Sequence, residues 1–287
     1  MENVNNLHII TCKPKILTDW IEYFIQFKGN GLFNTEIYAQ PYAYILFNHN
    51  HFLEISYQDK HLQTKKSILE PITLSPFRLK AKIDNDTIIF GAKVKSTFLY
   101  LLTGIPLNLI TGNILNLDEI FKEHVIELIA QINSAKTIPE KAEIAENYLL
   151  AKIKLFKENN LLDNYNAMKY LTQNFYSIFD IDQLIDKLNV SHRTLDRHFL
   201  KYTGVSPKAM LSLIRFSKTI DYAIKYKSFN LDTLWNFGYY DYAHFSKDFK
   251  KYYGKTFESF KQEIKIGENL QVSSQKSNIL LPEILIY

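Results

Sequence analysis

The order of apolar and polar positions divides the chain into a strand-rich front and a helical remainder. Over residues 1–113, β-branched and aromatic residues gather in short runs that predict strands, among them 43–48, 52–57 and 87–92. A short helix is expected at 17–27, which contains the run W-I-E-Y-F-I-Q-F. We therefore expect a strand-rich domain over 1–113 with one helix near its start.

From residue 115 the apolar residues are spaced mostly by three and four, which is typical of helices. Thr137 and Glu140 have the spacing of a capping box, in which each side chain hydrogen-bonds to the backbone N–H of the other, and they predict the start of a helix. These features predict a helical connector over 114–175. A tail is expected over 263–287, polar at first and apolar at its end.

One pattern of about 27 residues occurs twice, 50 residues apart. Its first copy carries Ile181, Asp182, Leu184, Ser191, Leu195, Arg197, Phe199, Lys201, Tyr202, Gly204 and Ser206, which correspond to Leu231, Asp232, Leu234, Asp241, Phe245, Lys247, Phe249, Lys251, Tyr252, Gly254 and Thr256. Each copy predicts a short helix, a tight turn, a capped second helix and a glycine stop. That is the outline of a helix-turn-helix, and two of them joined by one helix predict a DNA-binding function.

The second helix of the first copy, which Ser191 caps, has one apolar and one polar face. The apolar seam consists of Leu195, Phe199 and Tyr202, and the outward residues are Arg193, Asp196, Arg197, Leu200 and Lys201. Arg193 and Arg197 are one turn apart, so both can enter a major groove, and Asp196 can accept a hydrogen bond from the N4 amine of cytosine. Lys201, near the C-terminal end, is expected to contact phosphate.

The second copy has the same plan with a different outward face. Asp241 is the cap, the seam consists of Phe245, Phe249 and Tyr252, and the outward residues are Ala243, Ser246, Lys247, Lys250 and Lys251. This face has fewer specific hydrogen-bond donors, so we expect it to read fewer bases, mainly through Lys247. Lys250 and Lys251 are expected to contact the DNA backbone.

Between the copies, Ser206 is a cap and Pro207 stands at the first helical position, which predicts a helix over 207–226. About twenty residues at roughly 1.5 Å each span about 30 Å, close to the roughly 34 Å of one DNA turn. Two reading helices could thus enter successive major grooves without a partner chain. The alternative is a plain helical bundle whose basic positions form a solvated face.

The net charge of +4 is concentrated in the repeat region. Residues 177–262 hold 14 Lys and Arg against 9 Asp and Glu, whereas the rest of the chain holds 20 against 21. Of the four arginines in the chain, all but Arg78 lie in this region. Arginine presents a planar fork that fits guanine O6 and N7, so its placement favours DNA reading.

The composition also bears on location. The single cysteine, Cys12, excludes an intramolecular disulfide and a multi-cysteine zinc site, and it fits a reducing cytosol. No run of about 18 apolar residues occurs, and the N-terminus lacks the pattern of a signal peptide. These features predict a cytoplasmic protein.

Residues 179–262 resemble the DNA-binding domain of the AraC/XylS family of bacterial transcription regulators. The stretches L-N-V-S-H-R-T-L-D-R-H-F-L-K-Y-T-G-V-S-P and G-Y-Y-D-Y-A-H-F-S-K-D-F-K-K-Y-Y-G carry the resemblance. It implies a seven-helix module with two helix-turn-helix units bridged by a long helix, which binds promoter DNA in transcription regulation, as in activators of this family. By position, it implies base contacts from Arg193, Asp196, Arg197, Ala243, Ser246 and Lys247.

The sequence departs from the family pattern at two positions. Leu234 stands where a small alanine is usual, and Phe257 replaces the usual proline after the second unit. The larger Leu234 requires repacking, which leaves the tilt of the second unit open. Arg215 matches the characteristic arginine of the linker helix, and we expect its role to be structural.

The front domain offers one weak metal motif. His49 and His51, with Glu54, resemble the ligands of a cupin site, because alternate residues of a strand point to one face. The preceding glycine and the second cupin motif are absent, so a polar surface hairpin is the favoured interpretation. Lysines beside Cys12 could lower its thiol pKa, and some repair methyltransferases fuse a reactive cysteine to this same DNA module. Those enzymes also need a cysteine cluster for zinc, whereas this chain has a single cysteine. Without a phosphate loop or nucleophile motif, we expect no enzyme, cofactor or metal.

The expected fold is a multi-domain α+β protein. It consists of a strand-rich effector or oligomerisation domain over 1–113, a helical connector over 114–175, an all-α double helix-turn-helix domain over 176–262 and a tail over 263–287. The expected partners are double-stranded promoter DNA, RNA polymerase, a small-molecule effector and a second copy of the chain, with no membrane. The alternatives are an architectural DNA-binding protein with little sequence preference, or a metal-dependent cupin-like domain fused to a DNA-binding module.

Overall fold

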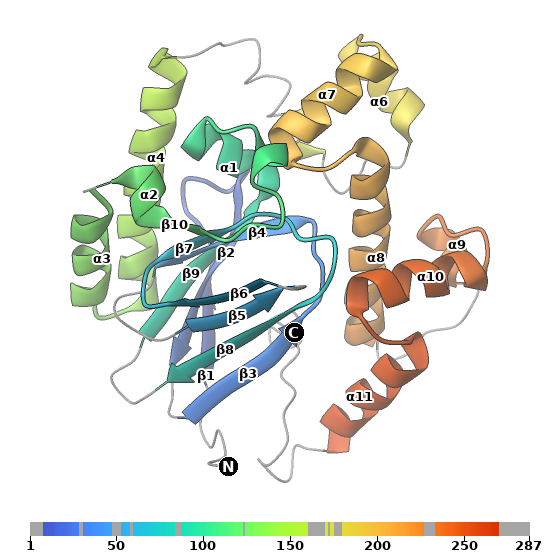
Figure 1. Ribbon diagram of the computed structural model, residues 1–287, viewed down its shortest axis with the longest axis horizontal. Helices are drawn as coiled ribbons and strands as arrows, with labels where there is room; N and C mark the ends of the chain where they lie inside the picture. Colours follow the sequence, from blue (N-terminus) through green and yellow to red (C-terminus); the bar gives the residue numbers. More distant parts are fainter. Residues whose placement is uncertain are drawn as a thin grey trace.

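The structure, a computed structural model, describes most of the chain. The described residues are 8–28, 31–47, 53–57, 60–83, 88–122, 124–159, 170–171, 173–174, 180–226 and 233–269. Strands dominate up to residue 116 and helices follow (Figure 1). The molecule is therefore a strand-rich N-terminal region joined to a helical C-terminal region, as the sequence predicts. In the described part, no helix combines the length and the apolar character that a membrane span requires.

The front half contains two antiparallel sheets. The six-stranded sheet has the order β1 (His8–Cys12), β2 (Ile21–Lys28), β9 (Ile88–Lys95), β4 (Tyr42–Phe47), β7 (Ile68–Glu70) and β10 (Leu115–Asn116). The four-stranded sheet has the order β3 (Gly31–Ile37), β8 (Phe77–Ile83), β5 (Leu53–Tyr57) and β6 (Lys60–Thr64). Ile25 and Ile89 of the first sheet share one buried cluster with Ile55 and Leu79 of the second, so the sheets face each other across a core.

The helix expected at 17–27 is wrong, because residues 17–20 form a turn and the rest belongs to strand β2. This strand pairs with β1 on one side and β9 on the other, and Tyr23, Phe24 and Ile25 in succession are buried. A strand that is covered on both faces has a continuous apolar run, which periodicity alone does not separate from a buried helix. The strands predicted at 43–48, 52–57 and 87–92 are confirmed as β4, β5 and β9.

Helices cover the outer face of the six-stranded sheet. These elements are α1 (Ser96–Thr103), the 3-10 turn η1 (Leu107–Leu109), α2 (Leu117–Phe121), α3 (His124–Ser134) and α4 (Ile138–Asn159). Phe24 and Phe90 of the sheet belong to one buried cluster with Phe98 of α1 and Leu149 of α4. Glu146 of α4 also accepts hydrogen bonds from the backbone N–H groups of residues 15–17, at 2.8 to 2.9 Å. The connector is thus fastened to the front sheets.

The predicted capping box at the start of α4 is confirmed. The Glu140 N–H donates to Thr137 Oγ1 at 3.4 Å, and the Thr137 N–H donates to Glu140 Oε2 at 3.1 Å. Hydrogen bonds from the backbone of Thr137 and Lys136 hold the pKa of the Glu140 carboxyl below its usual value. The box therefore stabilises the helix with an ionised glutamate.

The C-terminal half is helical. Its elements are α6 (Ile181–Leu188), α7 (His192–Thr203), α8 (Pro207–Tyr226), α9 (Thr233–Asn236), α10 (Tyr242–Tyr253) and α11 (Phe257–Asn269). Figure 1 shows α6 and α7 at one end of α8, with α9 and α10 beside it. The helix predicted at 207–226 is confirmed as α8. Helix α11 continues beyond residue 262, into the segment that was expected to be a tail.

Candidate nucleic-acid interface

The first helix-turn-helix consists of α6, a turn and α7. Asp180 caps α6, with its carboxylate accepting from the Asp182 N–H at 2.9 Å. Asn189 ends this helix in the left-handed conformation, with φ 50° and ψ 51°, which asparagine tolerates better than most residues. Ser191 then caps α7, as predicted, by accepting from the Thr194 N–H at 3.2 Å. The turn between the helices is therefore fixed by local hydrogen bonds.

The second unit repeats this construction in α9 and α10. Asp241 caps α10, as predicted, by accepting from the His244 N–H at 2.7 Å. Both reading helices have 12 residues and end at a glycine with positive φ, Gly204 and Gly254. Leu231 and Asp232, expected at the start of the second unit, lie outside the described residues. The two reading helices are therefore equivalent in their caps and their length.

Each reading helix packs through the predicted seam. The seam residues are buried, with at most 2% of each exposed; they are Leu195, Phe199, Tyr202, Phe245, Phe249 and Tyr252. Because the seam occupies one face, the opposite face of each helix is left for a partner.

On α7, the structure places the three proposed base-reading residues in solvent. Arg193, Asp196 and Arg197 are all exposed. Lys201 is different, because it is half-buried and its Nζ lies 5.3 Å from the centre of the Tyr100 ring, which belongs to α1. A contact between Lys201 and phosphate would compete with this cation–π contact.

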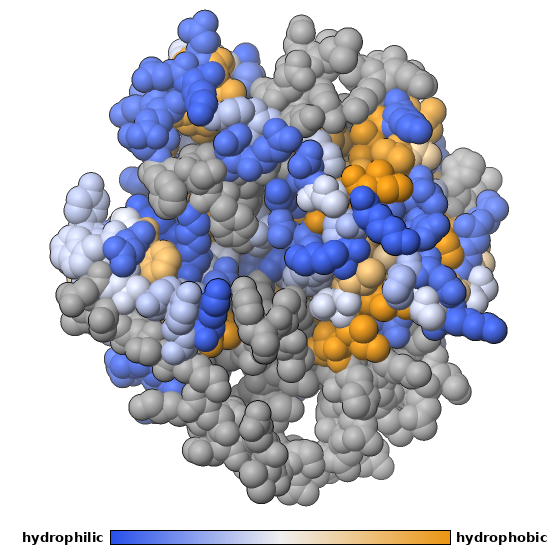
Figure 2. Space-filling model, turned by 180° about the vertical axis from the view of Figure 1, so that it is seen from behind, coloured by the Kyte–Doolittle hydropathy of each residue, from blue (hydrophilic) through white to orange (hydrophobic). Residues whose placement is uncertain are grey.

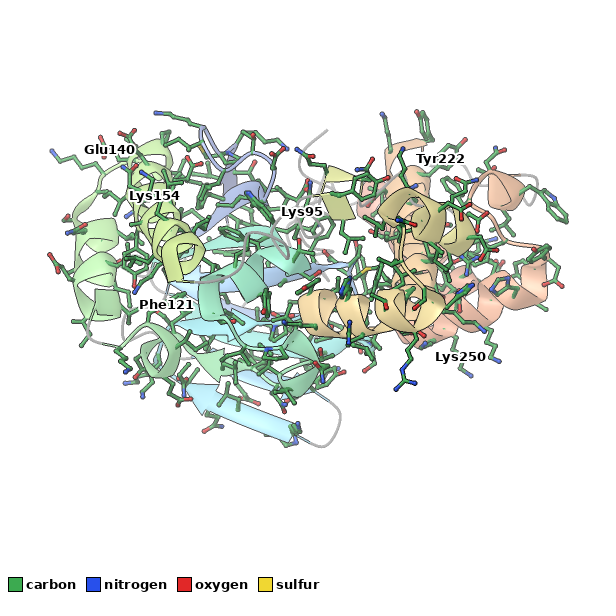
Figure 3. The ribbon with its side chains drawn as sticks, turned by 90° about the horizontal axis from the view of Figure 1, so that it is seen from above. Lys95, Phe121, Glu140, Lys154, Tyr222 and Lys250 are labelled. Carbon is green, nitrogen blue, oxygen red and sulfur yellow. The ribbon has the colours of Figure 1, made fainter. Side chains whose placement is uncertain are left out.

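On α10, Ala243, Lys247, Lys250 and Lys251 are exposed and Ser246 is half-buried. Lys251 Nζ lies 4.6 Å from the centre of the Tyr252 ring and donates to its hydroxyl at 3.2 Å. Figure 3 shows Lys250 at the outer surface of the helical half, away from the sheets. Helix α10 thus has Ala243 and Lys247 at the positions of Arg193 and Arg197.

Polar contacts fix α8 to the second unit. Ser212 Oγ donates to Asp248 Oδ2 at 2.6 Å, which ties α8 to α10. Arg215 donates from Nη1 to the Gly238 carbonyl at 3.3 Å, and its guanidinium lies 5.6 Å from the centre of the Tyr239 ring. Arg215 therefore joins α8 to the turn before α10, in keeping with the structural role expected for it.

The two departures from the family pattern are both accommodated in the core. Leu234 is 3% exposed and belongs to the main buried cluster. Phe257, in place of the usual proline, packs edge to face against Phe245 and Phe249 with ring centres 5.0 and 5.1 Å away. Such aromatic pairs stabilise beyond the area they bury.

Sequence reasoning missed a group of exposed aromatic residues on the second unit. Trp235, Tyr240 and Tyr242 are 62%, 78% and 41% exposed. Tyr240 and Tyr242 flank the cap Asp241 at the start of α10, where the outline Y-D-Y was visible in the sequence. Neither tyrosine belongs to the apolar seam of α10, and this position outside the seam could have predicted their exposure.

The front domain contacts the C-terminal ends of both reading helices. At the end of α7, Thr111 Oγ1 donates to the Gly204 carbonyl at 3.0 Å, and the Tyr100 and Tyr202 rings lie 5.0 Å apart. At the end of α10, the Ala39 N–H donates to the Tyr252 carbonyl at 2.9 Å. The front domain is thus packed against the C-terminal end of the second helix of each unit.

The surface near the reading helices is polar and carries cations. Figure 2 shows the face opposite to that of Figure 1, where hydrophilic residues dominate the side of α6 and α7 and apolar residues gather on the side of α4. Burial lowers the pKa of the His198 imidazole, and Arg197 and Lys201 lower it further. His198 is therefore expected to be neutral at physiological pH, and the charge of α7 comes from its arginines and lysine.

The structure does not test the metal motif of the front domain. His49 and His51 lie outside the described residues, and the carboxylate of Glu54 pairs with Lys80 Nζ at 2.9 Å. Within the described residues, no cluster of three or more His, Cys, Asp or Glu side chains is arranged to hold a metal ion. Cys12 is half-buried and donates weakly to the Lys13 carbonyl at 3.5 Å.

Comparisons with known proteins locate one family within the chain. Residues 184–263 match the family model of a helix-turn-helix domain. A search of curated proteins found no match. Among solved structures, apo ToxT from Vibrio cholerae strain SCE256 is 13% identical, with 91% of this chain and 99% of that chain covered at a TM-score of 0.42. The AraC-like transcriptional activator CuxR is 10% identical, with 67% and 79% covered at a TM-score of 0.34. Residues 184–263 of this chain therefore form a helix-turn-helix domain.

Proposed function

We propose that this protein is a sequence-specific transcription regulator that binds double-stranded promoter DNA. The observation that carries the proposal is the pair of capped, 12-residue helices, each with a buried seam and an exposed polar face. A single helix of 20 residues, α8, joins the two units. Its length of about 30 Å is close to one turn of DNA, which suits entry into successive major grooves.

The two units have unequal roles in this proposal. Arg193, Asp196 and Arg197 read bases from α7, and Ala243, Ser246 and Lys247 make fewer and less specific base contacts from α10. Phosphate contacts come from Lys201, Lys250 and Lys251. The exposure of Arg193, Asp196 and Arg197 supports base reading from α7, because a groove-reading residue must reach beyond the protein surface.

The domain limits are part of the proposal. We assign residues 1–113 to an effector or oligomerisation domain, 114–175 to a connector and 176–262 to DNA binding, with 263–287 as a tail. Strand β10 pairs with β7, so residues 115 and 116 belong to the six-stranded sheet although they follow the limit at residue 113. The front domain would bind a small-molecule effector or a second copy of the chain, and RNA polymerase would be a further partner at the promoter.

Titration of the full chain against duplexes tests this function. Bound sites would first be mapped across the genome of the source cell, and the best site would be compared with a scrambled duplex over a range of salt concentrations. A sequence-specific regulator prefers its site at every salt concentration. An architectural protein would show affinities that follow salt alone and no preference, and that result would contradict the proposal.

A further inference from the structure

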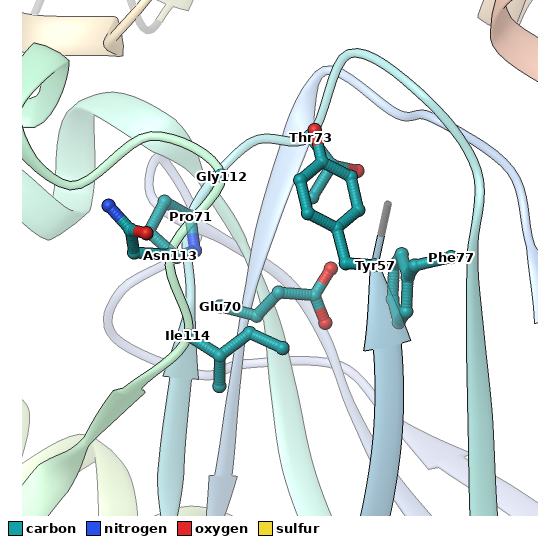
Figure 4. A pocket seen from close by; sticks show the side chains of 8 residues that line it. All are labelled: Tyr57, Glu70, Pro71, Thr73, Phe77, Gly112, Asn113 and Ile114. Carbon is teal, nitrogen blue, oxygen red and sulfur yellow. The ribbon is translucent and has the colours of Figure 1, made fainter. Parts of the chain in front are cut away.

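The front domain contains a buried carboxylate that the DNA-binding function does not use. Glu70 ends strand β7 and is 6% exposed. Its carboxylate points into a pocket between the two sheets, toward Tyr57, Phe77 and Ile114 (Figure 4). Thr73 lies above this space in the same view.

Glu70 has no cation in direct contact in the described part of the chain. Lys93 lies two strands away in the same row of the sheet, with its Nζ 4.3 Å from the centre of the Tyr42 ring. No hydrogen bond or ion pair joins its carboxylate to another described residue, and burial raises its pKa to about 8. Leaving a buried carboxyl group unpaired costs free energy, so native proteins usually give it a partner. A ligand that brings a positive charge would supply that partner.

The space beside Glu70 has two parts. In the inner pocket, the centre of a water-sized group can move within a volume of about 10 Å³. The pocket therefore has room for one such group. An outer groove of about 370 Å³ shares Tyr57, Gly112, Asn113 and Ile114 with the inner pocket. Apolar Ile55 and Leu62 line the groove, and at its edge Lys60 Nζ donates to Asn113 Oδ1. The site therefore offers a buried carboxyl group at an end sized for a small head group. Beside it is a wider groove, where apolar Ile55 and Leu62 lie next to Lys60 and His61.

We propose that this site binds a small primary amine, whose ammonium group pairs with Glu70 and whose carbon chain lies in the outer groove. An ammonium group is close to water in size, whereas a guanidinium or a quaternary ammonium exceeds the inner pocket. A ligand carboxylate would bring no positive charge to pair with Glu70. A divalent cation would need six or more oxygen ligands, and Glu70 is the one carboxylate that lines the pocket.

The site is connected to the first reading helix by one loop. Gly112, Asn113 and Ile114 line both parts of the pocket, and the preceding Thr111 donates to the Gly204 carbonyl at the end of α7. An amine that moves this loop changes the support of α7. This effector role rests on the proposed DNA-binding function, and linkage then requires that amine and DNA change each other's affinity by the same factor.

Calorimetric titration of the full chain tests the site without DNA. The probes are n-hexylamine, hexan-1-ol and hexanoate, which share a chain and differ in the head group. Hexylamine is expected to saturate a single site and to bind at least about tenfold more tightly than the other two probes. Hexylamine that fails to saturate the site, or binds no better than hexan-1-ol or hexanoate, would overturn the proposal.

Two variants and a control tie binding to the pocket. Glu70→Gln keeps the shape and removes the charge, so it should weaken hexylamine binding at least about tenfold. Ile114→Phe fills the inner pocket and should abolish binding while the circular dichroism spectrum stays unchanged. Glu119→Gln alters a carboxylate that is bonded to Asn116 outside the pocket and should leave binding unchanged. Wild-type affinity in either pocket variant would contradict the assignment.

A second titration separates the site from its effector role. Hexylamine affinity is measured with and without the bound duplex, beside the salt series that tests sequence preference. An affinity that differs between the two supports the effector role, and equal affinities overturn it. A lack of sequence preference would defeat the DNA-binding proposal by itself, whatever the calorimetric result.

Discussion

Arg193 and Arg197 differ from Lys247 and Lys251 in what they can recognise. A guanidinium is a rigid fork that bonds guanine O6 and N7 together, whereas an ammonium is a point charge suited to phosphate. Both arginines are exposed on the outer face of α7. On this ground we propose that the first unit provides most of the sequence discrimination.

Substituting these residues should separate specificity from affinity. Arg193→Ala and Arg197→Ala should each cost about 1 to 3 kcal/mol on the preferred duplex and much less on a scrambled one. Lys251→Ala should weaken binding to both duplexes alike and reduce the salt slope by about one unit. Lys261→Ala, at an ion pair with Glu258 on α11, serves as a control that should change neither. Gel-shift titrations measure all four, and equal losses on both duplexes for the arginine variants would contradict the division.

Glu70 should make the stability of the protein fall as the pH rises. Below the ordinary pKa of 4.5 both the folded and unfolded states hold the proton. Between 4.5 and about 8 the unfolded state loses it and the folded state keeps it, so stability falls by about 1.4 kcal/mol per pH unit. Tyr57 is the other ionisable side chain that lines the inner pocket.

Glu70→Gln should remove this loss. The variant should be more stable than the wild type at pH 7.5, and the difference should shrink toward zero near pH 4.5. Urea unfolding at several pH values between these limits measures it. A difference that does not vary with pH would show that Glu70 is not held in its neutral form.

At this scale the sequence indicated some roles and concealed others. Ser191 and Asp241 were predictable as caps, because a cap bonds to a backbone three residues away and the spacing is local. The burial of Glu70 and the position of Lys201 over Tyr100 depend on segments far apart in the chain. No local pattern records such contacts.

At the scale of elements, the helix-turn-helix repeat was predictable and strand β2 was not. The repeat supplies two independent copies of one pattern, so caps, seams and stops support each other across 50 residues. Strand β2 has no second copy and is covered on both sides, by β1 and β9 in the sheet and by core residues on its faces. Its partners, which decide its conformation, are distant in sequence.

The cap of α7 should contribute measurably to the first unit. Ser191→Ala removes the hydrogen bond to the Thr194 N–H and should destabilise the helix by about 1 kcal/mol, whereas Ser191→Asp should keep most of it. Hydrogen exchange of the α7 amides measures the change. Equal protection in the two variants would mean that the cap is not needed to hold the helix.

At the scale of the whole molecule, the front domain and the helical half share one continuous buried cluster. Leu107 and Tyr100 from the front belong to it together with Tyr202 and Phe216 from the helices. Tyr38 extends this contact, with its ring 5.9 Å from those of Phe216 and Tyr253. A ligand or mutation in the front domain can therefore alter the DNA-binding half by direct contact.

The hydroxyl of Thr111 provides a specific test of this interface. Thr111→Val removes its bonds to the Leu107 and Gly204 carbonyls, and the control Thr219→Val removes one local bond to the Arg215 carbonyl. The free energy of unfolding should fall by about 1 kcal/mol more in the Thr111 variant than in the control, because the Thr111 variant also loses an interdomain hydrogen bond. Thermal unfolding measures the difference, and hydrogen exchange at the end of α7 should rise in the Thr111 variant alone. Identical behaviour would argue against a stabilising contact.

Because the front domain supports the ends of both reading helices, the proposed binding to DNA should depend on the helical pitch of the DNA. The carbonyls of Gly204 and Tyr252 are held by the same front domain, and α8 sets the distance between the units. One inserted base pair turns the second half-site by about 36° around the DNA axis, since a turn takes about 10 base pairs. A single-pair insertion should weaken binding sharply, and inserting a full turn should not restore it, because a single chain cannot stretch by another 34 Å or so. Recovery with a full-turn insertion would instead identify two chains, one on each half-site.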